Sequence, residues 1–262
     1  MRPGPLRVPS PLMDGTVTLP TITTHDDGSV TVENPITASI AMISPWSVSI
    51  PTHVSLWEAC NNRAHAADGV YVDAHWIRPT GPYLDDGRNA CVQTFLAHHD
   101  TDWLVFADAD VEFSRSDLVH LLYTAQSEGW HVLSGAYCTP LEGDPRNTFT
   151  VAYRNHRING PGAQLVALEN SEVVAGVDAI PVDVVGMGFC AISRPILQYM
   201  AQFYAPPCPW FFEPIADETH HGEDVGFCLR LRALGVEIGL HRGVRVNHYK
   251  TARFNYDGLT LF

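Results

Sequence analysis

Two aspartates follow a run of apolar residues in the stretch W-L-V-F-A-D-A-D-V-E-F, residues 103–113. The run predicts a buried strand that stops at Asp108, with Asp110 two positions further along. Side chains two residues apart on an extended chain point to the same side, so the two carboxylates would repel each other and would be unstable if buried without partners. Mg²⁺ or Mn²⁺ removes both problems, because these ions take oxygen ligands and also hold phosphate oxygens. The pair therefore predicts a cation site that binds a diphosphate, although aspartates in a turn also cap a following helix.

A second pair of acids, Glu223 and Asp224, opens the helical stretch E-D-V-G-F-C-L-R-L-R-A-L. A carboxylate is a common general base for taking a proton from a hydroxyl group. The backbone N–H groups at the start of a helix also favour anionic side chains, which is a purely structural reason for acids at these two positions.

An aromatic and proline-rich segment, F-Y-A-P-P-C-P-W-F-F-E-P, covers residues 203–214. Trp210, Phe211 or Phe212 would suit the floor of a site for a sugar, because sugars stack their apolar faces on aromatic rings. The alternative interpretation is a proline-stiffened loop that packs into the core. Trp57 is expected to be a core residue.

Strands and helices are expected to alternate in the first half of the chain. Strands are predicted near residues 37–45, 69–77, 103–107 and 130–137, and helices at 54–67, 88–99 and 114–125, the last with a serine cap. Strands that are apolar throughout favour a largely parallel sheet with helices on both faces, and ligands bind beyond the carboxyl ends of such strands. The second half is expected to hold strands broken by turns and a short helix at 223–234.

The residues before this region differ in composition, being rich in Pro, Thr, Gly and Asp. Two short alternating pieces, T-V-T-L and S-V-T-V, are separated by T-H-D-D-G. The pattern predicts a small hairpin or a draped extension at the N-terminus.

The 262-residue chain is acidic, with 29 Asp and Glu against 16 Lys and Arg and a formal net charge of −13. Nucleic-acid binders normally carry a basic face, so DNA and RNA are not expected partners. The six cysteines lack C-x-x-C spacing and are expected to be reduced core residues of a cytosolic protein. No apolar stretch reaches the length of a membrane span, and the first residues do not resemble a signal peptide. A cytoplasmic location is therefore expected.

Six segments, taken in order, resemble the successive motifs of a nucleotide-sugar-dependent glycosyltransferase of the GT-A fold. They are R-N-A-C-V-Q-T-F-L, D-W-L-V-F-A-D-A-D-V-E-F, L-S-G-A-Y-C-T-P, D-V-V-G-M-G-F-C-A-I-S-R, G-E-D-V-G-F-C-L-R-L-R-A-L-G and V-N-H-Y-K. The chain is similar to the family-2-like members found in actinobacteria and their bacteriophages, over about residues 37–250. The resemblance implies a single α/β, Rossmann-like GT-A domain with a mostly parallel central sheet and helices on both faces.

The implied domain covers residues 37–262, with a nucleotide-binding half at 37–140 and an acceptor-binding half at 141–262. Residues 1–36 would form a small N-terminal β extension outside it.

The resemblance also implies a role for each matching residue. Asp108 and Asp110 would coordinate Mn²⁺ or Mg²⁺ and, through the ion, the diphosphate of the donor, with Asp108 also part of the donor site. His248 would complete the metal shell. Arg88 and Asn89 would begin a helix that faces the nucleotide.

On the acceptor side, Gly186 and Gly188 in the turn G-M-G-F would line the pocket for the donor sugar or the acceptor. Asp224 would be the general base of an inverting transfer, with Glu223 in a supporting or acceptor-binding role. The carboxylate that reads the base or the ribose is best assigned to Asp73, at the end of the second strand.

Two assignments stay open. His220, His221 and His241 compete with His248 as ligands, because a lone histidine is more often a hydrogen-bonded structural residue than a ligand. The nucleotide-binding segment after the first strand is either S-P-W-S or S-I-P-T-H.

The function implied is a metal-dependent, hexosyltransferase-like enzyme that moves a sugar from a nucleoside-diphosphate-sugar, with a UDP-sugar favoured, to a hydroxyl group of a protein or glycan. A bacteriophage origin would make a virion protein an acceptor and the host cytoplasm the location. The alternatives are a nucleotidyltransferase and a non-catalytic protein that binds nucleotide-sugars or glycans. A zinc hydrolase is less favoured, because H-H-G-E-D lacks the i, i+4 histidine pair of helix-borne zinc sites.

Overall fold

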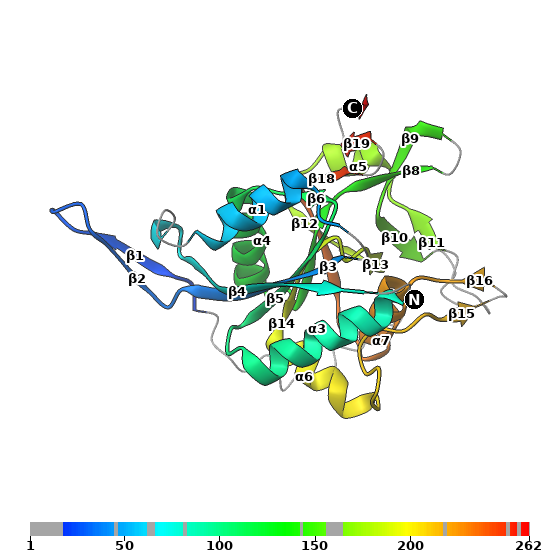
Figure 1. Ribbon diagram of the computed structural model, residues 1–262, viewed down its shortest axis with the longest axis horizontal. Coiled ribbons are helices and arrows are strands. Elements are labelled where there is room, and N and C mark those ends of the chain that lie inside the picture. Colours follow the sequence, from blue (N-terminus) through cyan, green and yellow to red (C-terminus); the bar gives the residue numbers. More distant parts are fainter. Residues whose placement is uncertain are drawn as a thin grey trace, which may run out of the picture.

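A central β-sheet with helices on both faces forms the body of the molecule (Figure 1). The computed structural model describes residues 18–44, 47–61, 66–80, 83–141, 144–155, 165–216, 219–249, 252–255 and 258–261. The described strands of the central sheet are, in spatial order, β12 (Ala179–Val182), β17 (Ile238–Arg245), β7 (Val132–Ala136), β14 (Phe189–Ser193), β5 (Trp103–Asp108), β3 (Ile36–Ser44) and β4 (Val70–Pro79).

The sheet is mixed, and the mostly parallel character that the sequence led us to expect is not confirmed. β3 pairs in parallel with β4 and β5, and β7 pairs in parallel with β17. β14 lies between β5 and β7 and is antiparallel to both, and β12 is antiparallel to β17. Five strands therefore share one direction, and their carboxyl ends share one edge. A strand that is buried on both faces is apolar in whichever direction it runs, so the sequence of β14 did not reveal its reversal.

Two layers of helices cover the sheet. The helices are α1 (Ile50–Cys60), α3 (Leu84–His98), α4 (Arg115–Glu128), α5 (Asn170–Val174), α6 (Arg194–Phe203) and α7 (Glu223–Ala233), with a 3-10 turn at Ala66–Asp68. α3, α6 and α7 share one apolar cluster with Leu104 and Phe106 of β5, whereas α1 and α4 share the other with Val105 and Ala107. The alternation along β5 thus sends neighbouring side chains to opposite layers.

The N-terminal hairpin extends away from the sheet (Figure 1). β1 (Thr21–Thr24) pairs with β2 (Val30–Glu33) in antiparallel register. The expected hairpin is confirmed, but its first strand is T-I-T-T and not T-V-T-L, which begins outside the described residues. The Asp27 carboxylate accepts hydrogen bonds from the Ser29 amide and hydroxyl, and this turn fixes Thr24 opposite Val30.

Short strands surround the carboxyl edge of the main sheet. A four-stranded sheet has the order β20 (Gly258–Leu261), β19 (Ala252–Asn255), β18 (Asn247–Tyr249) and β6 (Val111–Glu112). The remaining strands are β11 (Leu165–Ala167), β10 (Ala152–Asn155) and β13 (Val184–Val185) in one sheet, and the pairs β8 (Cys138–Leu141) with β9 (Asp144–Thr150) and β15 (Ile215–Ala216) with β16 (Thr219–His220).

All six cysteines are free thiols, and four of them are buried. Among the helices of the described ranges, none combines the length and the apolar character that crossing a bilayer requires.

Candidate functional site

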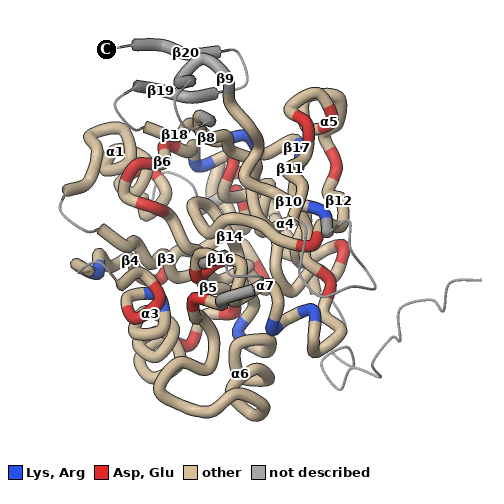
Figure 2. Tube along the Cα trace, turned by 90° about the vertical axis from the view of Figure 1, so that its right-hand side faces the viewer, with Lys and Arg blue, Asp and Glu red and all other residues tan. Residues whose placement is uncertain are grey.

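The site is built at the edge where β5 ends and β14 begins. Asp108 is the last residue of β5, and its backbone N–H donates to the Gly188 carbonyl at 2.9 Å. Its side chain is 31% exposed. Figure 2 shows acidic positions, in red, clustered where β5, α3 and α7 approach one another. The end of a buried strand therefore brings a carboxylate to the surface, as the sequence predicted.

Asp110 and His248 lie against each other. His248 Nε2 is 3.4 Å from Asp110 Oδ2, and the buried imidazole places its other nitrogen, Nδ1, 3.1 Å from the Cys138 carbonyl oxygen. Because a carbonyl only accepts, Nδ1 carries a proton and donates it. Nε2 then faces a carboxylate oxygen, and that contact is favourable when either a proton or a metal ion lies between the two atoms.

The pairing of the short strands β6 and β18 brings His248 and Asp110 together. His248 lies opposite Val111, and the Tyr249 amide donates to the Asp110 carbonyl at 2.6 Å. Glu112 holds the two strands together, because its Oε2 accepts from the Asn247 amide group at 2.6 Å and from the Tyr249 hydroxyl at 3.0 Å. Glu112 was the third acid of the opening stretch, and its supporting role was not predicted.

The side chains of Asp108, Asp110 and His248 are only partly arranged to bind a divalent cation such as Mg²⁺ or Mn²⁺. Two ligands at about 2.1 Å from an octahedral ion, meeting at a right angle, lie about 3 Å apart, close to the separation of Asp110 Oδ2 and His248 Nε2. Within the described residues, however, no group of three or more His, Cys, Asp or Glu side chains is arranged to hold a metal ion. Asp108 is turned towards Arg88, so a three-ligand site would require its carboxylate to shift towards Asp110.

Arg88 is the buried cation of the site. From α3, its Nη2 donates to Asp108 Oδ1 at 3.1 Å and its Nε donates to Glu223 Oε1 at 2.8 Å. The guanidinium carbon lies 5.1 Å from the centre of the Phe106 ring. Burial lowers the pKa of Arg88, but the carboxylates of Asp108 and Glu223 more than offset this, and the net shift is upward. The guanidinium is therefore a permanent charge that joins β5 to α7.

Asp224 has the electrostatics of a proton acceptor. Burial and the neighbouring charge of Glu223 raise its pKa from 3.8 to about 6, although Oδ1 accepts the Val225 amide proton at 2.8 Å. The same carboxylate contributes, after burial, to the raised pKa values of Tyr137 and Tyr153. A carboxylate whose pKa approaches neutrality is a stronger base than an ordinary aspartate.

The two glycines of G-M-G-F pack on Tyr137 at the back of the site. A Cβ atom at Gly186 would lie 2.0 Å from the Tyr137 hydroxyl oxygen, and one at Gly188 would lie 2.8 Å from the Tyr137 ring carbon Cζ. The Gly188 amide donates to that hydroxyl at 3.1 Å. Their contact with a donor sugar or acceptor stays a prediction, whereas their contact with Tyr137 explains why both lack a side chain.

Gly186→Ala should destabilise the protein by about 1–3 kcal/mol, the usual effect of overpacking a filled core, measured as a lower thermal unfolding midpoint. Adding Tyr137→Phe removes the clashing oxygen and should recover part of the loss. Recovery will be incomplete, because Val151 Cγ1 also lies 2.7 Å from the new Cβ position. Additive destabilisation by the two changes would contradict this packing explanation.

Asn89 serves the fold of the aromatic segment. Its amide nitrogen donates to the carbonyl oxygens of Asp85 and Phe211, and its oxygen accepts from the amides of Trp210 and Phe211. The Trp210 and Phe211 side chains are buried, so the core-packing alternative is confirmed for these two. Phe212 is partly buried and lies under the Arg230 guanidinium, 4.0 Å from the ring centre.

The structure does not bring Asp73 to this edge. It lies at a bulge of β4, between the register pairs Ala38–Val72 and Ser39–Ala74. Ser39 is level with Leu104, four residues before Asp108, so Asp73 lies roughly 13–16 Å below the carboxyl edge. Its carboxylate is 3.5 Å from His99 Nδ1.

Of the competing histidines, His241 has its ring nitrogens engaged elsewhere. His241 Nδ1 accepts from the amides of Gly243 and Val244, while Nε2 lies 3.0 Å from the Thr124 hydroxyl. His221 donates its backbone amide to the Pro214 carbonyl, and the side chain of His220 lies outside the described residues. Of the segments proposed for the nucleotide, S-P-W-S includes two residues that are not described, and S-I-P-T-H forms the cap and first turn of α1.

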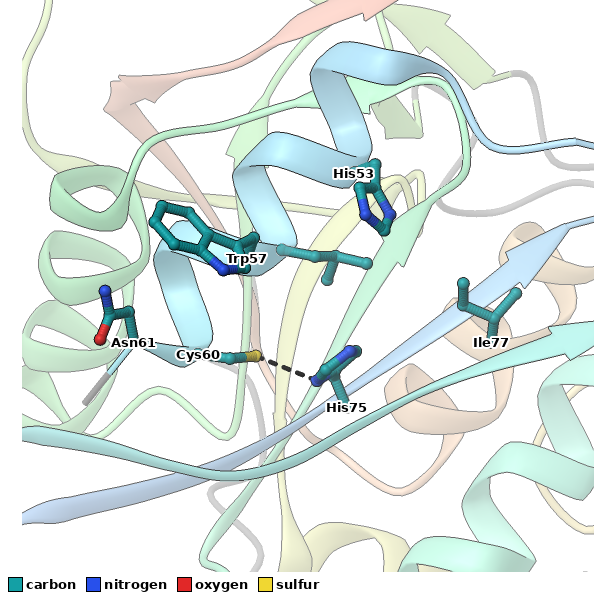
Figure 3. A pocket seen from close by; sticks show the side chains of 7 residues that line it. His53, Trp57, Cys60, Asn61, His75 and Ile77 are labelled. Atoms are coloured by element: carbon teal, nitrogen blue, oxygen red, sulfur yellow. Dashed lines mark hydrogen bonds between the residues drawn. The ribbon is translucent and has the colours of Figure 1, made fainter. Parts of the chain in front are cut away.

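A hollow of about 350 Å³ lies apart from these acids, between α1 and β4 (Figure 3). Its described lining residues are His53, Leu56, Trp57, Cys60, Asn61, His75 and Ile77. Trp57 was expected in the core but is 65% exposed. Burial raises the pKa of the Cys60 thiol to about 11, and its sulfur lies 3.3 Å from His75 Nδ1. α1 covers the face of the sheet opposite to α3 and α7, so this hollow is separate from the acid cluster.

Comparison with known proteins shows that this chain is similar to solved structures in its fold. No family model matches the chain, and no curated protein matches it by sequence. The structure is similar to that of A197 from STIV, with a TM-score of 0.53 and 18% identity over 86% of this chain and 94% of that chain. A weaker likeness, at a TM-score of 0.49 and 12% identity, is to GalNAc-T7 crystallised with UDP, GalNAc and Mn²⁺, over 83% of this chain and 45% of that one. At these identities the first likeness shows the fold alone, and the second is too weak to argue from.

Proposed function

We propose that the protein is a metal-dependent glycosyltransferase that moves a sugar from a nucleoside diphosphate to a hydroxyl group of a protein or glycan acceptor. The observation that carries the proposal is the meeting of two acid pairs at one sheet edge. Asp110 faces His248 at 3.4 Å, and Asp108 is joined through Arg88 to Glu223, the neighbour of Asp224. The order of motifs along the sequence supports the same function.

Each group has a task in this reaction. Asp108, Asp110 and His248 would hold Mn²⁺ or Mg²⁺, which neutralises charge on the departing diphosphate. The Cys138 carbonyl fixes the orientation of the imidazole, so Nε2 would be the atom that faces the ion. Asp224, with its pKa raised to about 6, would take the proton of the acceptor hydroxyl as the new glycosidic bond forms.

A panel of nucleotide-sugars, with UDP-sugars first, tests the proposal by thermal shift with and without Mn²⁺. A stabilising donor should raise the unfolding midpoint only when Mn²⁺ is present, because the phosphates bind through the ion. Slow hydrolysis of that donor should then release a nucleoside diphosphate. Release of pyrophosphate would instead indicate a nucleotidyltransferase, and stabilisation without turnover would indicate a binding protein. The absence of any stabilising nucleotide would contradict the proposal.

A further inference from the structure

Arg88 connects two parts of the site that are distant in sequence. Its Nε donates to Glu223, 135 positions along the chain, and its Nη2 donates to Asp108 on β5. The Arg88 and Glu223 side chains are only 5% and 8% exposed. An ion pair this buried holds its partners firmly, because separating them would leave a charge without compensation.

The guanidinium does not have all its donors satisfied. Arg88 Nη1 is buried and has no hydrogen-bond partner among the described residues. A buried donor without an acceptor is unfavourable, so Nη1 is available to an acceptor that moves within its reach. A cation bound at Asp110 would also take the Asp108 carboxylate as a ligand. Arg88 and the cation therefore compete for one carboxylate.

We propose that Arg88 is a positioning residue that couples cation binding at Asp108 and Asp110 to the placement of Glu223 and Asp224 at the start of α7. The inference rests on the proposed function, since it takes the cation site and the acid pair from it. When a cation draws the Asp108 carboxylate, the Arg88 donors turn towards Glu223 and hold the first turn of α7. The existing bond between Arg88 and Glu223 is then strengthened, so the start of α7 is held more firmly when the cation is bound.

Coupling between two sites is reciprocal, so a change at Glu223 must alter cation affinity. Glu223→Gln leaves Asp108 as the carboxylate that accepts a hydrogen bond from Arg88 among the described residues, while Asp224 still acts on Arg88 through its charge. The Arg88–Asp108 pair strengthens and competes better with the ion. Calorimetric titration of the full-length protein with Mn²⁺ alone, about two pH units above the Asp224 pKa, should show affinity reduced about fivefold or more.

Two variants separate this link from a simple loss of negative charge. Asp224→Asn removes the same charge from the next residue, which interacts with Arg88 through its charge but accepts no hydrogen bond from it among the described residues, and should reduce Mn²⁺ affinity by less than about twofold. Arg88→Lys keeps the positive charge but cannot donate to two carboxylates in the fork geometry of a guanidinium. In the Arg88→Lys background, Glu223→Gln should no longer change Mn²⁺ affinity. Thermal unfolding checks that each variant is folded.

Equal losses of affinity in Glu223→Gln and Asp224→Asn would overturn the coupling while leaving the cation site in place. Persistence of the Glu223→Gln effect in the Arg88→Lys background would do the same. If the unaltered protein binds no Mn²⁺, both the coupling and the proposed function are wrong. Should Arg88→Lys fail to fold, the comparison of Glu223→Gln with Asp224→Asn still decides.

Discussion

Asp224→Asn is expected to lose sugar transfer by about 10²–10⁴-fold while donor binding stays unchanged, because general-base catalysis contributes on this scale. Asparagine matches the size of aspartate and keeps an oxygen for the Val225 amide, but it cannot take a proton. Single-turnover transfer and calorimetric donor binding, measured on the same preparation, separate the two effects. Full transfer by this variant would remove Asp224 as the base.

The pH dependence of transfer has a defined sign. In the proposed reaction the Asp224 carboxylate acts in its ionised form, so the transfer rate should rise as pH increases towards about 6 and fall about tenfold per pH unit below the midpoint. A bound cation offsets the charge of Asp108, so with Mn²⁺ the midpoint should lie at or below this value.

Between pH 3.8 and about 6 the folded state holds a proton on Asp224 that the unfolded state has lost, so the free energy of unfolding should decrease as pH rises through that window.

Asp178→Asn is the matched control for Asp224→Asn. Asp178 is also an aspartate, but it is paired with Arg242, and its side chain is 59% exposed and lies beside β12. Its replacement should leave both the transfer rate and the pH profile unchanged. A flat pH profile in the unaltered protein, between about pH 5 and 7, would contradict the assignment of the base to a carboxylate with this pKa.

Asp110→Ala is expected to abolish Mn²⁺-dependent donor binding, with affinity at least about 100-fold weaker, since changes even to residues behind a metal ligand reduce affinity 10–100-fold. The substitution removes the oxygen that faces His248 Nε2. Calorimetry with the donor found in the thermal-shift panel, with and without Mn²⁺, measures the effect. Residual binding without metal should be the same in both proteins.

Asp102→Asn serves as the control at the other end of β5. Asp102 precedes β5 at the opposite edge of the sheet, where it accepts a hydrogen bond from the Thr37 hydroxyl at 2.7 Å. The charge lost is the same, so a general electrostatic effect would weaken binding in both variants. Unchanged metal-dependent affinity in Asp110→Ala would count directly against the cation site.

Local patterns predicted most of the elements that carry the site. Ser114 caps α4, and Asp117 completes a reciprocal capping box with it, as expected for a serine before a helical stretch. The strand that ends at Asp108 and the helix that begins at Glu223 both lie where they were expected. These predictions succeeded because apolar periodicity and caps act over a few residues.

Features that depend on pairing between residues far apart in the chain could not be predicted from the sequence. No local pattern in the sequence indicates that β18 pairs with β6, although this pairing places His248 beside Asp110. The bulge that leaves Asp73 far below the edge appears only in the register of β3 against β4. Trp57 was expected to be buried because it is a large aromatic residue. It faces outward because Leu56 and Ala59 lie on the buried side of α1.

Helix α6 was overlooked although its signals are present. Pro195 occupies the first turn, a favoured position for proline. Ile196, Leu197 and Met200 then lie on one buried face, with the spacing of an amphipathic helix. The stretch followed the apolar run of β14 so closely that the change of period from two to about 3.6 was missed.

The register between β5 and β14 limits how this protein could be re-engineered. The Asp108 amide is bonded to Gly188, and five consecutive residue pairs follow from Phe189–Ala107 to Ser193–Trp103. An insertion or deletion of one residue in either strand would exchange the inner and outer faces of every later pair. Variation in this part of the molecule is therefore restricted to substitutions at constant length, and libraries that alter loop length belong elsewhere on the chain.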